Sequence, residues 1–306
     1  MKTDSFDKPL KGELLYRAKL APFTTWRVGG EAEIIYRPVD AEDMAGFIQA
    51  NQDKPITILG AGSNVLVRDG GIAGVVIITA GTMNSLSIDG ETVCVDAGVG
   101  CPSFASSCRK AQLSGAEFLA GIPGTIGGAI KMNAGAYGSE IWDLIEKIKV
   151  VDNQGQIKEL TKGEVEHGYR SCNLADDNWV ITAYLRLKKS EAHELEQIHE
   201  KVKVLQKKRS DTQPLNEYNC GSVFKNPQGD HAARLIDEAG LKGLEIGGAK
   251  VSNKHANFIV NTGNATAAEI EQLIELVKEK VKQIHGVDLE TEVKVMGNKI
   301  RNKGER

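Results

Sequence analysis

The sequence predicts an α+β protein in which two domains follow an N-terminal lead-in at residues 1–27. Residues 28–189 hold many short β-type runs bounded by turn residues, together with a few helical stretches, and we expect them to form one domain with two lobes. Residues 190–306 alternate helical stretches with short strands, which predicts a compact second α+β domain. Two glycine-rich loops interrupt the first domain.

The first domain is predicted to begin with a strand-helix-strand unit. A strand at residues 32–37 ends before Pro38, a helix at 41–51 carries apolar residues on one face, and a second strand follows at 56–59. The strands after it include a hairpin that turns at Asp89-Gly90, which predicts a type I′ turn. The further elements of this domain are expected as strands at residues 65–67, 75–78, 85–88, 92–96, 146–152, 156–160 and 180–188 and as helices at residues 102–113 and 161–167. Residues 1–23 show too little periodicity to predict an element.

The second domain is predicted to be organised by helices. Apolar residues recur at helical spacing over residues 191–208 and 266–285, and Thr266 with Glu269 forms a capping box for the second of these helices. The remaining elements are expected as a helix at residues 230–239 and strands at residues 249–251, 258–261 and 289–296.

The longer glycine-rich loop, residues 121–138, reads GIPGTIGGAIKMNAGAYG. Its six glycines leave backbone N–H groups uncovered, and such a surface suits a phosphate. A helix that begins near Ile126 would add its positive N-terminal end. A simple set of turns is the alternative interpretation. A second loop of the same kind, GAGSN at residues 60–64, favours anion binding.

The shorter loop matches neither of two well-known phosphate-binding motifs. The dinucleotide fingerprint needs a glycine where this chain has Val65, and the next residues indicate a strand instead of a helix. The ending Gly-Lys-Ser/Thr of a P-loop occurs nowhere in the chain. The sequence therefore gives no support to Rossmann-type NAD binding or P-loop chemistry.

Composition narrows the classes of protein further. The 306 residues carry a net charge of −3, which gives no general reason to expect a nucleic-acid partner. The opening residues contain no apolar run typical of a signal peptide and no later run would span a bilayer, so we expect a cytoplasmic protein. The five cysteines include no C-x-x-C pair and the histidines are widely spaced, so we predict no disulfide framework and no metal site.

A set of motifs in a fixed order carries a resemblance to a known family. The motifs are TTWRVGG from Thr24, GAGSNVLVRD from Gly60, the loop from Gly121, YRSCNL from Tyr169, QPLNEYNCGSVFKNP from Gln213 and LETEVKVMG from Leu289. Over about residues 15–297 the chain closely resembles the UDP-N-acetylenolpyruvoylglucosamine reductases, flavoenzymes that complete UDP-N-acetylmuramate for bacterial peptidoglycan. The lengths between motifs resemble the shorter subtype, which lacks an added substrate-capping loop. The resemblance implies an FAD-binding domain of the vanillyl-alcohol-oxidase type followed by a substrate-binding domain.

The resemblance also implies the cofactors. FAD is expected to bind non-covalently, since neither loop contains a histidine, and NADPH is expected as the hydride donor. The expected FAD-binding residues are those of the two loops that match the family: Gly60, Ala61, Gly62, Ser63, Asn64, Val65, Leu66, Gly121, Ile122, Pro123, Gly124, Thr125, Gly127, Gly128, Asn133, Ala134 and Gly135.

Three residues match the catalytic set of the family. Ser222 resembles the proton donor, and Arg170 and Glu292 resemble the pair that holds the enolpyruvyl carboxylate of UDP-N-acetylglucosamine enolpyruvate. Hydride addition at C3 of the enol ether loads charge onto C2 and its carboxylate, and a guanidinium can stabilise that charge. A carboxylate beside the substrate's own would repel it, so a shared proton is expected. Each residue alone has a plainer interpretation as a surface or turn residue.

Further matches suggest contacts to the substrate or the nicotinamide, at Tyr169, Gln213, Lys225 and Asn226. Cys220 stands where many members of the family have a smaller residue, and a buried position is expected for it. An oxidase or dehydrogenase of the same flavin fold, or a nucleotide-sugar binder without flavin, are the alternatives. No exposed apolar stripe argues against a monomer.

Overall fold

A computed structural model of the chain describes residues 10–300, and the described chain divides into two compact units. Unit 1 comprises the N-terminal residues as far as Tyr16 together with residues 34–61 and 74–205, and unit 2 comprises residues 17–33, 62–73 and those from 206 onward. These units are defined by contacts, so the domain boundaries predicted from the sequence, 28–189 and 190–306, stay a prediction. Helices and strands are mixed in both units, as expected of an α+β protein.

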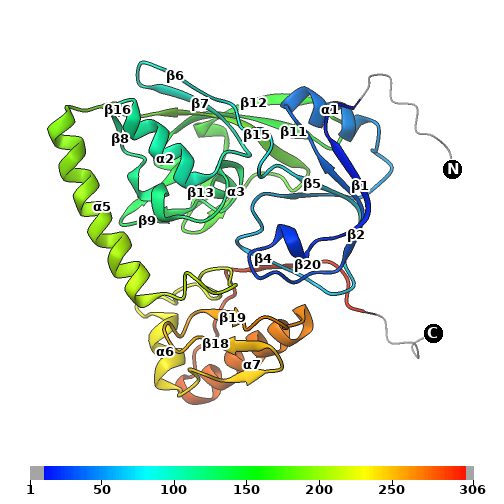
Figure 1. The fold of residues 1–306 in the computed structure, drawn as a ribbon, viewed down its shortest axis with the longest axis vertical. Helices are drawn as coiled ribbons and strands as arrows, with labels where there is room; N and C mark the ends of the chain where they lie inside the picture. The colour runs from blue at the N-terminus through cyan, green and yellow to red at the C-terminus, as the bar shows by residue number, and fades with distance from the viewer. Residues whose placement is uncertain (1–9, 301–306) are drawn as a thin grey trace. The chain divides into compact units, whose positions relative to one another are not determined.

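A four-stranded sheet belongs mainly to unit 1, and β3 and β5 in it are parallel. Helix α1 begins at its N-cap Asp40, whose carboxylate accepts a hydrogen bond from the Asp43 N–H at 2.7 Å. The helix buries Phe47, which stacks on Tyr36 with ring centroids 3.8 Å apart. The strands, in sheet order, and the helix are β1 (Glu13–Lys19), β2 (Glu31–Arg37), β5 (Ile72–Ile78), β3 (Ile56–Leu59) and α1 (Ala41–Gln49) (Figure 1).

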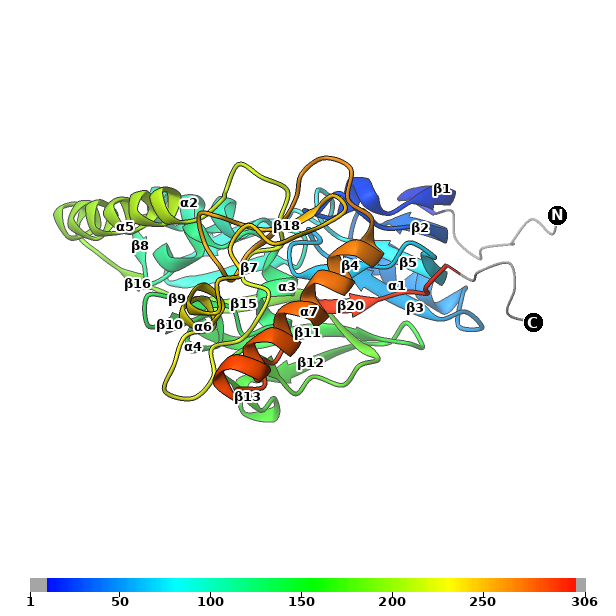
Figure 2. The ribbon, with the colours of Figure 1, turned by 90° about the horizontal axis from the view of Figure 1, so that it is seen from below.

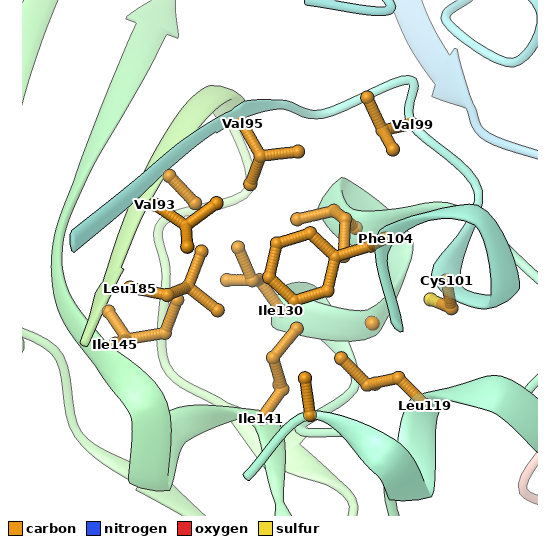
Figure 3. Packing of buried hydrophobic residues seen from close by; sticks show 14 of the residues in the cluster. Val93, Val95, Val99, Cys101, Phe104, Leu119, Ile130, Ile141, Ile145 and Leu185 are labelled. Atoms are coloured by element: carbon orange, nitrogen blue, oxygen red, sulfur yellow. The ribbon is translucent and has the colours of Figure 1, made fainter. Parts of the chain in front are cut away.

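The second sheet of unit 1 has five antiparallel strands. Apolar side chains of α2, α3 and the segment between them form one core with this sheet, and Phe104 lies among Val93, Val95 and Ile130 (Figure 3). The elements, strands in sheet order, are β12 (Ile157–Thr161), β11 (Ile145–Asp152), β15 (Asn178–Arg186), β7 (Thr92–Asp96), β6 (Leu86–Asp89), α2 (Cys101–Lys110), η2 (Glu117–Gly121) and α3 (Ile126–Lys131).

Short elements complete unit 1, and the long helix α5 (Ala192–Thr212) runs past its last residue. The short elements are β8 (Leu113–Ser114), β9 (Gly135–Ala136), β10 (Ser139–Glu140), α4 (Ile141–Leu144), η3 (Lys162–Glu164), β13 (His167–Gly168), β14 (Ser171–Cys172) and β16 (Lys188–Lys189).

Unit 2 is built around α7 (Ala267–His285), which packs on the three-stranded sheet β17-β18-β19; Figure 1 shows α7 beside β18 and β19. Its core includes Trp26 and Leu66, which come from segments far earlier in the chain. Strand β20 pairs in parallel with β4 (Figure 1 and Figure 2). The remaining elements of unit 2 are η1 (Ala21–Phe23), β4 (Val65–Val67), α6 (Ala232–Glu238), β17 (Glu245–Ile246), β18 (Ala249–Val251), β19 (Ile259–Asn261) and β20 (Lys294–Met296).

Most predicted elements are confirmed within a few residues, and three expectations are wrong. Residues 13–19 form a strand, although the sequence indicated no element there. In the hairpin of β6 and β7, Asp89 pairs with Thr92, so Gly90 and Glu91 form the turn; only the glycine has a positive φ, which fits type II′ and not type I′. The last strand is confined to 294–296, because residues 290–293 bond to residues 223–225 through single bridges.

Candidate active site

The longer glycine loop is fastened to the segment before α2. The carbonyl of Gly124 accepts a hydrogen bond from the Cys101 N–H at 3.0 Å, and Gly100 forms an isolated bridge with Thr125. A Cβ on Gly60 would lie 2.6 Å from the Thr125 Oγ1, so only glycine allows the shorter loop to pass this close. Unit 1 therefore brings Gly60, at the start of the shorter loop, next to Thr125 of the longer loop, and both residues are predicted to bind FAD.

Helix α3 begins at Ile126 as predicted, with Thr125 as its N-cap. Its first amides are nevertheless taken: the N–H of Ile126 donates to Val99 O and that of Gly127 to Ala97 O, both at 2.9 Å. These two groups cannot serve a phosphate. The adjoining segment already supplies their acceptors, and the contribution of the positive N-terminal end of this helix to FAD binding stays a prediction.

Arg170 lies at the tip of a two-residue hairpin. Gly168 pairs with Ser171, so Tyr169 and Arg170 form the turn between β13 and β14. The φ of Arg170 is +53°, in the left-handed region that costs a residue with a Cβ roughly 1–2 kcal/mol. Tyr169 is 58% exposed, and the Arg170 guanidinium carbon lies 5.6 Å from the centre of its ring. Such strain in an exposed turn is typical of a residue that is retained for its side chain.

The hairpin is tied to the end of the longer glycine loop. Arg170 Nη2 donates to the carbonyl of Gly135 at 2.9 Å. Asn133 Nδ2 donates to Gly168 O at 2.9 Å and to the Glu140 carboxylate at 2.6 Å, while its Oδ1 accepts from the Trp142 N–H at 3.4 Å. The buried Asn133 side chain thus has protein partners for both of its N–H groups. Unit 1 therefore joins Arg170 to the predicted FAD-binding residues Asn133 and Gly135.

The later half of the shorter glycine loop lies in unit 2. Gly62 has φ +63°, and a Cβ there would lie 2.2 Å from the carbonyl oxygen of Phe23. Thr25 donates to Gly62 O through its N–H at 3.1 Å and through its hydroxyl at 3.3 Å. The motif TTWRVGG, for which no role was predicted, therefore stabilises this loop through the hydrogen bonds of Thr25.

Unit 2 also brings Ser222 and Glu292 to adjacent backbone segments. The chain reaches Ser222 through Gly221, which has φ +81°. One residue later, the Val223 carbonyl accepts a hydrogen bond from the Glu292 N–H at 2.8 Å. Asn64 Nδ2 donates to the Glu292 carbonyl at 3.2 Å, so the shorter loop is a neighbour of both.

Cys220 is buried, as predicted, with 5% of its surface exposed. Burial raises the pKa of its thiol well above the usual value, and the negative charge of Glu292 raises it further. The thiol therefore stays protonated at neutral pH.

The remaining predicted contact residues already have protein partners. Lys225 forms an ion pair with Glu290, and Asn226 Oδ1 accepts from the Ala232 N–H at 3.1 Å. Gln213 Oε1 accepts from Arg209 Nε at 2.6 Å. All of these partners lie in unit 2. Arg170 lies in unit 1, and its meeting with Ser222 and Glu292 in one site stays a prediction.

The described residues contain neither a cluster of metal-ligating side chains nor a helix that could span a membrane. Between residues 10 and 300, no group of three or more His, Cys, Asp or Glu side chains is arranged to hold a metal ion. Over the same range, every helix is too short or too polar to cross a membrane.

Comparison with known proteins identifies the two parts of the chain. A family model described as FAD binding domain matches residues 32–161, and one described as UDP-N-acetylenolpyruvoylglucosamine reductase, C-terminal domain, matches residues 213–296. Reductases of that name from Alkalilimnicola ehrlichii and Legionella pneumophila (strain Corby) are each 46% identical to the chain. The alignments cover 94% of this chain in both cases and 95% and 94% of the two relatives.

A solved structure agrees with these matches. The crystal structure of the UDP-N-acetylenolpyruvylglucosamine reductase from Thermus caldophilus superposes on the chain with a TM-score of 0.81 at 35% identity, and the match covers 94% of this chain and 99% of that one. The resemblance that the ordered motifs indicated is confirmed. The chain belongs to the UDP-N-acetylenolpyruvoylglucosamine reductase family, with an FAD-binding domain and the C-terminal domain of that family.

Proposed function

We propose that this protein reduces UDP-N-acetylglucosamine enolpyruvate to UDP-N-acetylmuramate, using NADPH as hydride donor and FAD as bound cofactor, in peptidoglycan precursor synthesis. Family membership supports the reaction. The observation that carries the residue roles is the hydrogen bond between Glu292 N–H and Val223 O, which keeps the proposed proton donor Ser222 next to the proposed carboxylate partner.

The close packing around glycines in the shorter loop supports the assignment of both loops to FAD. Gly60 and Gly62 sit where a Cβ would collide with Thr125 and Phe23, so the backbone there is closely packed and favours glycine. We assign residues 60–66 and the family-matching residues of 121–135 as the FAD contacts, without a covalent bond. When bound, FAD supplies hydride transfer between nicotinamide and substrate.

The side chains have separate roles in this proposal. Arg170 provides a permanent cation with two parallel donors for the enolpyruvyl carboxylate, and its bond to Gly135 O holds the guanidinium in one direction. Glu292 shares a proton with that carboxylate, since two ionised carboxylates side by side would repel each other. Ser222 gives its proton to C2 of the substrate. Tyr169, Gln213, Lys225 and Asn226 are assigned to the rest of the substrate or to the nicotinamide.

Several finer features belong to the same proposal. NADPH and the UDP sugar use one site in turn, which gives ping-pong kinetics. The enzyme works as a monomer in the cytoplasm. Its product enters cell-wall synthesis and thereby serves cell division and cell shape.

Ser222→Ala tests the proposal. Purified wild-type protein is expected to be yellow, with flavin absorbance near ~450 nm. NADPH should bleach this absorbance in both proteins, because that step needs no proton from Ser222. The enolpyruvyl substrate should restore it about 100-fold or more slowly in the variant.

Ser252→Ala is the matched control, since Ser252 is also in unit 2 and its hydroxyl only accepts a hydrogen bond from the Lys254 N–H. It should behave like wild type. Normal turnover by Ser222→Ala would refute the role of the serine. The proposed reductase function would be refuted by a colourless protein. It would also be refuted if wild-type protein consumed NADPH at the same rate with and without the enolpyruvyl substrate.

A further inference from the structure

We propose that Asn257 is a positioning residue for this reaction: its side-chain amide fixes the backbone that carries Ser222 and sets the place of Ser222 relative to Glu292. The inference rests on the function proposed above. No role was predicted for Asn257, because nothing in the run HANF marks an asparagine that bonds to a segment 33 residues away.

Asn257 makes three hydrogen bonds to the two residues that follow Ser222. Its Oδ1 accepts from the Phe224 N–H at 3.0 Å, and its Nδ2 donates to the Phe224 carbonyl at 2.8 Å. Its own backbone carbonyl accepts from the Val223 N–H at 2.9 Å. Asn257 is 4% exposed and Phe224 is 2% exposed, so water is not at hand to replace these bonds.

The opposite edge of the same segment carries Glu292. Val223 O accepts from the Glu292 N–H at 2.8 Å, and the Lys225 N–H donates to Glu290 O at 2.9 Å. Residues 223–225 therefore lie between Asn257 on one side and residues 290–292 on the other. A change at Asn257 frees one side of the segment, and the position of Ser222 then depends on the bonds to the other side alone.

A side chain is needed here because the ladder of the adjoining sheet ends too early. Strand β19 begins at Ile259, two residues after Asn257. A carboxamide offers one donor and one acceptor in the same plane, as a peptide group does, and so extends the pairing beyond the strand. The ring of His255 contacts Phe258 edge-on, and its Nδ1 accepts from the Asn257 N–H at 3.3 Å, which holds the turn itself.

Asn257→Ala and Asn257→Asp test the inference with two readouts. The first is hydrogen exchange of the 223–225 amides in protein without substrate. Exchange at Phe224 should accelerate about tenfold or more in Asn257→Ala, as expected when a buried donor loses its acceptor. Asn257→Asp keeps an acceptor for the Phe224 N–H but sets a buried carboxylate oxygen against the Phe224 carbonyl oxygen, so it should also displace residues 223–225 and accelerate their exchange, and it serves if the alanine variant does not fold.

The second readout separates the two halves of the catalytic cycle. NADPH should bleach the flavin of Asn257→Ala at a rate within about twofold of wild type, because Ser222 has no role in hydride transfer from NADPH to the flavin. The enolpyruvyl substrate should restore the absorbance up to about 100-fold more slowly, since a displacement near 1 Å at a reacting group has effects of this size.

Asn51→Ala is the matched control. Asn51 is 2% exposed and donates to Phe47 O at 3.0 Å at the end of α1 in unit 1. It should lower the melting temperature and leave both flavin steps unchanged. Unchanged exchange at Phe224, or equal slowing of both steps in Asn257→Ala, would overturn the inference. Failure of wild type to use the enolpyruvyl substrate would instead overturn the proposed function, while the exchange experiment would still test the role of Asn257.

Discussion

Single polar residues hold the proposed site by bonding to backbone atoms distant in sequence. Asn133 bonds to Gly168 beside the Arg170 turn, and Asn257 bonds to Phe224 beside Ser222. Arg170 itself adopts a left-handed backbone at φ +53°. A strained conformation persists only where surrounding contacts fix it, and the bond from Arg170 to Gly135 is one such contact. At this scale, the backbone strain at Arg170 is offset by contacts that fix the position of its side chain.

The cysteines allow a prediction about reactivity at alkaline pH. Burial raises the pKa of Cys101 and of Cys108 to about 12, and the pKa of Cys220 is raised by burial and by Glu292. A thiol with a raised pKa holds little reactive thiolate, tenfold less for each unit. Burial also raises the pKa of the half-buried Cys172, so at pH 8 Cys94 should react with a disulfide reagent first, Cys172 more slowly, and the other three thiols only after unfolding.

Thiol counts in native and denatured protein, with mass spectrometry of the labelled peptides, check this expectation. A Cys220→Ala variant should give the same native count as wild type. Rapid labelling of Cys220 in native protein would contradict the buried position.

At the scale of elements, helix α7 has two N-terminal caps of different origin. Thr266 and Glu269 form the capping box that the sequence predicted. Asp69, from the motif after the shorter glycine loop, accepts hydrogen bonds from the Ala267 and Ala268 N–H groups at 2.9 and 2.8 Å. The glycine-loop motif thus continues into a carboxylate that stabilises a helix nearly two hundred residues later.

Removal of the distant cap should destabilise unit 2. Asp69→Ala leaves two helix amides without their acceptor, and the free energy of unfolding should fall by about 1 kcal/mol. Asp288→Ala is the comparison, because Asp288 only forms an exposed ion pair with Lys282, and its loss should change the free energy by less than about 0.5 kcal/mol. Urea unfolding of both variants measures the difference. Equal values would show that Asp69 does not act as a cap.

These elements also show how far a sequence can be interpreted. The capping box of α7 was predictable because its donors and acceptors lie within four residues. Strand β1 was missed because it has exposed and half-buried residues without a clear alternation. No local pattern encodes the hydrogen bonds that join residues 33 to 199 positions apart. Examples are the side-chain bonds of Asn133 to Gly168 and of Asn257 to Phe224, and the cap that Asp69 provides for α7. The site residues themselves came from the family motifs and not from periodicity.

At the scale of the whole molecule, unit 2 is assembled from separate parts of the chain. Trp26 is fully buried in its core; Trp26 Nε1 donates to Ile259 O and Trp26 O accepts from Asn261 Nδ2, both at 2.8 Å. Asn64 O accepts from the Lys294 N–H at 3.0 Å, where β4 and β20 run in parallel. The proposed FAD loop at residues 62–66 therefore depends on the last strand of the chain.

A chain that ends after Val293 tests this dependence. It keeps Glu292 and both glycine loops but lacks β20, so β4 loses its pairing partner and the loop its support. The truncated protein should purify with little or no flavin absorbance and melt at a lower temperature. A chain that ends after Ile300 keeps every contact described above and should retain flavin like the full-length protein. Full flavin content without β20 would refute the dependence.

The parallel pairing of β4 with β20 also orders events during synthesis. A ribosome adds about 5–20 residues each second, so roughly 10 seconds or more separate the synthesis of β4 from that of β20. Leu66, fully buried in the finished protein, is without that partner strand for the whole interval. Under the proposed assignment of residues 62–66 to FAD, flavin capture through this loop has to wait until β20 has been synthesised.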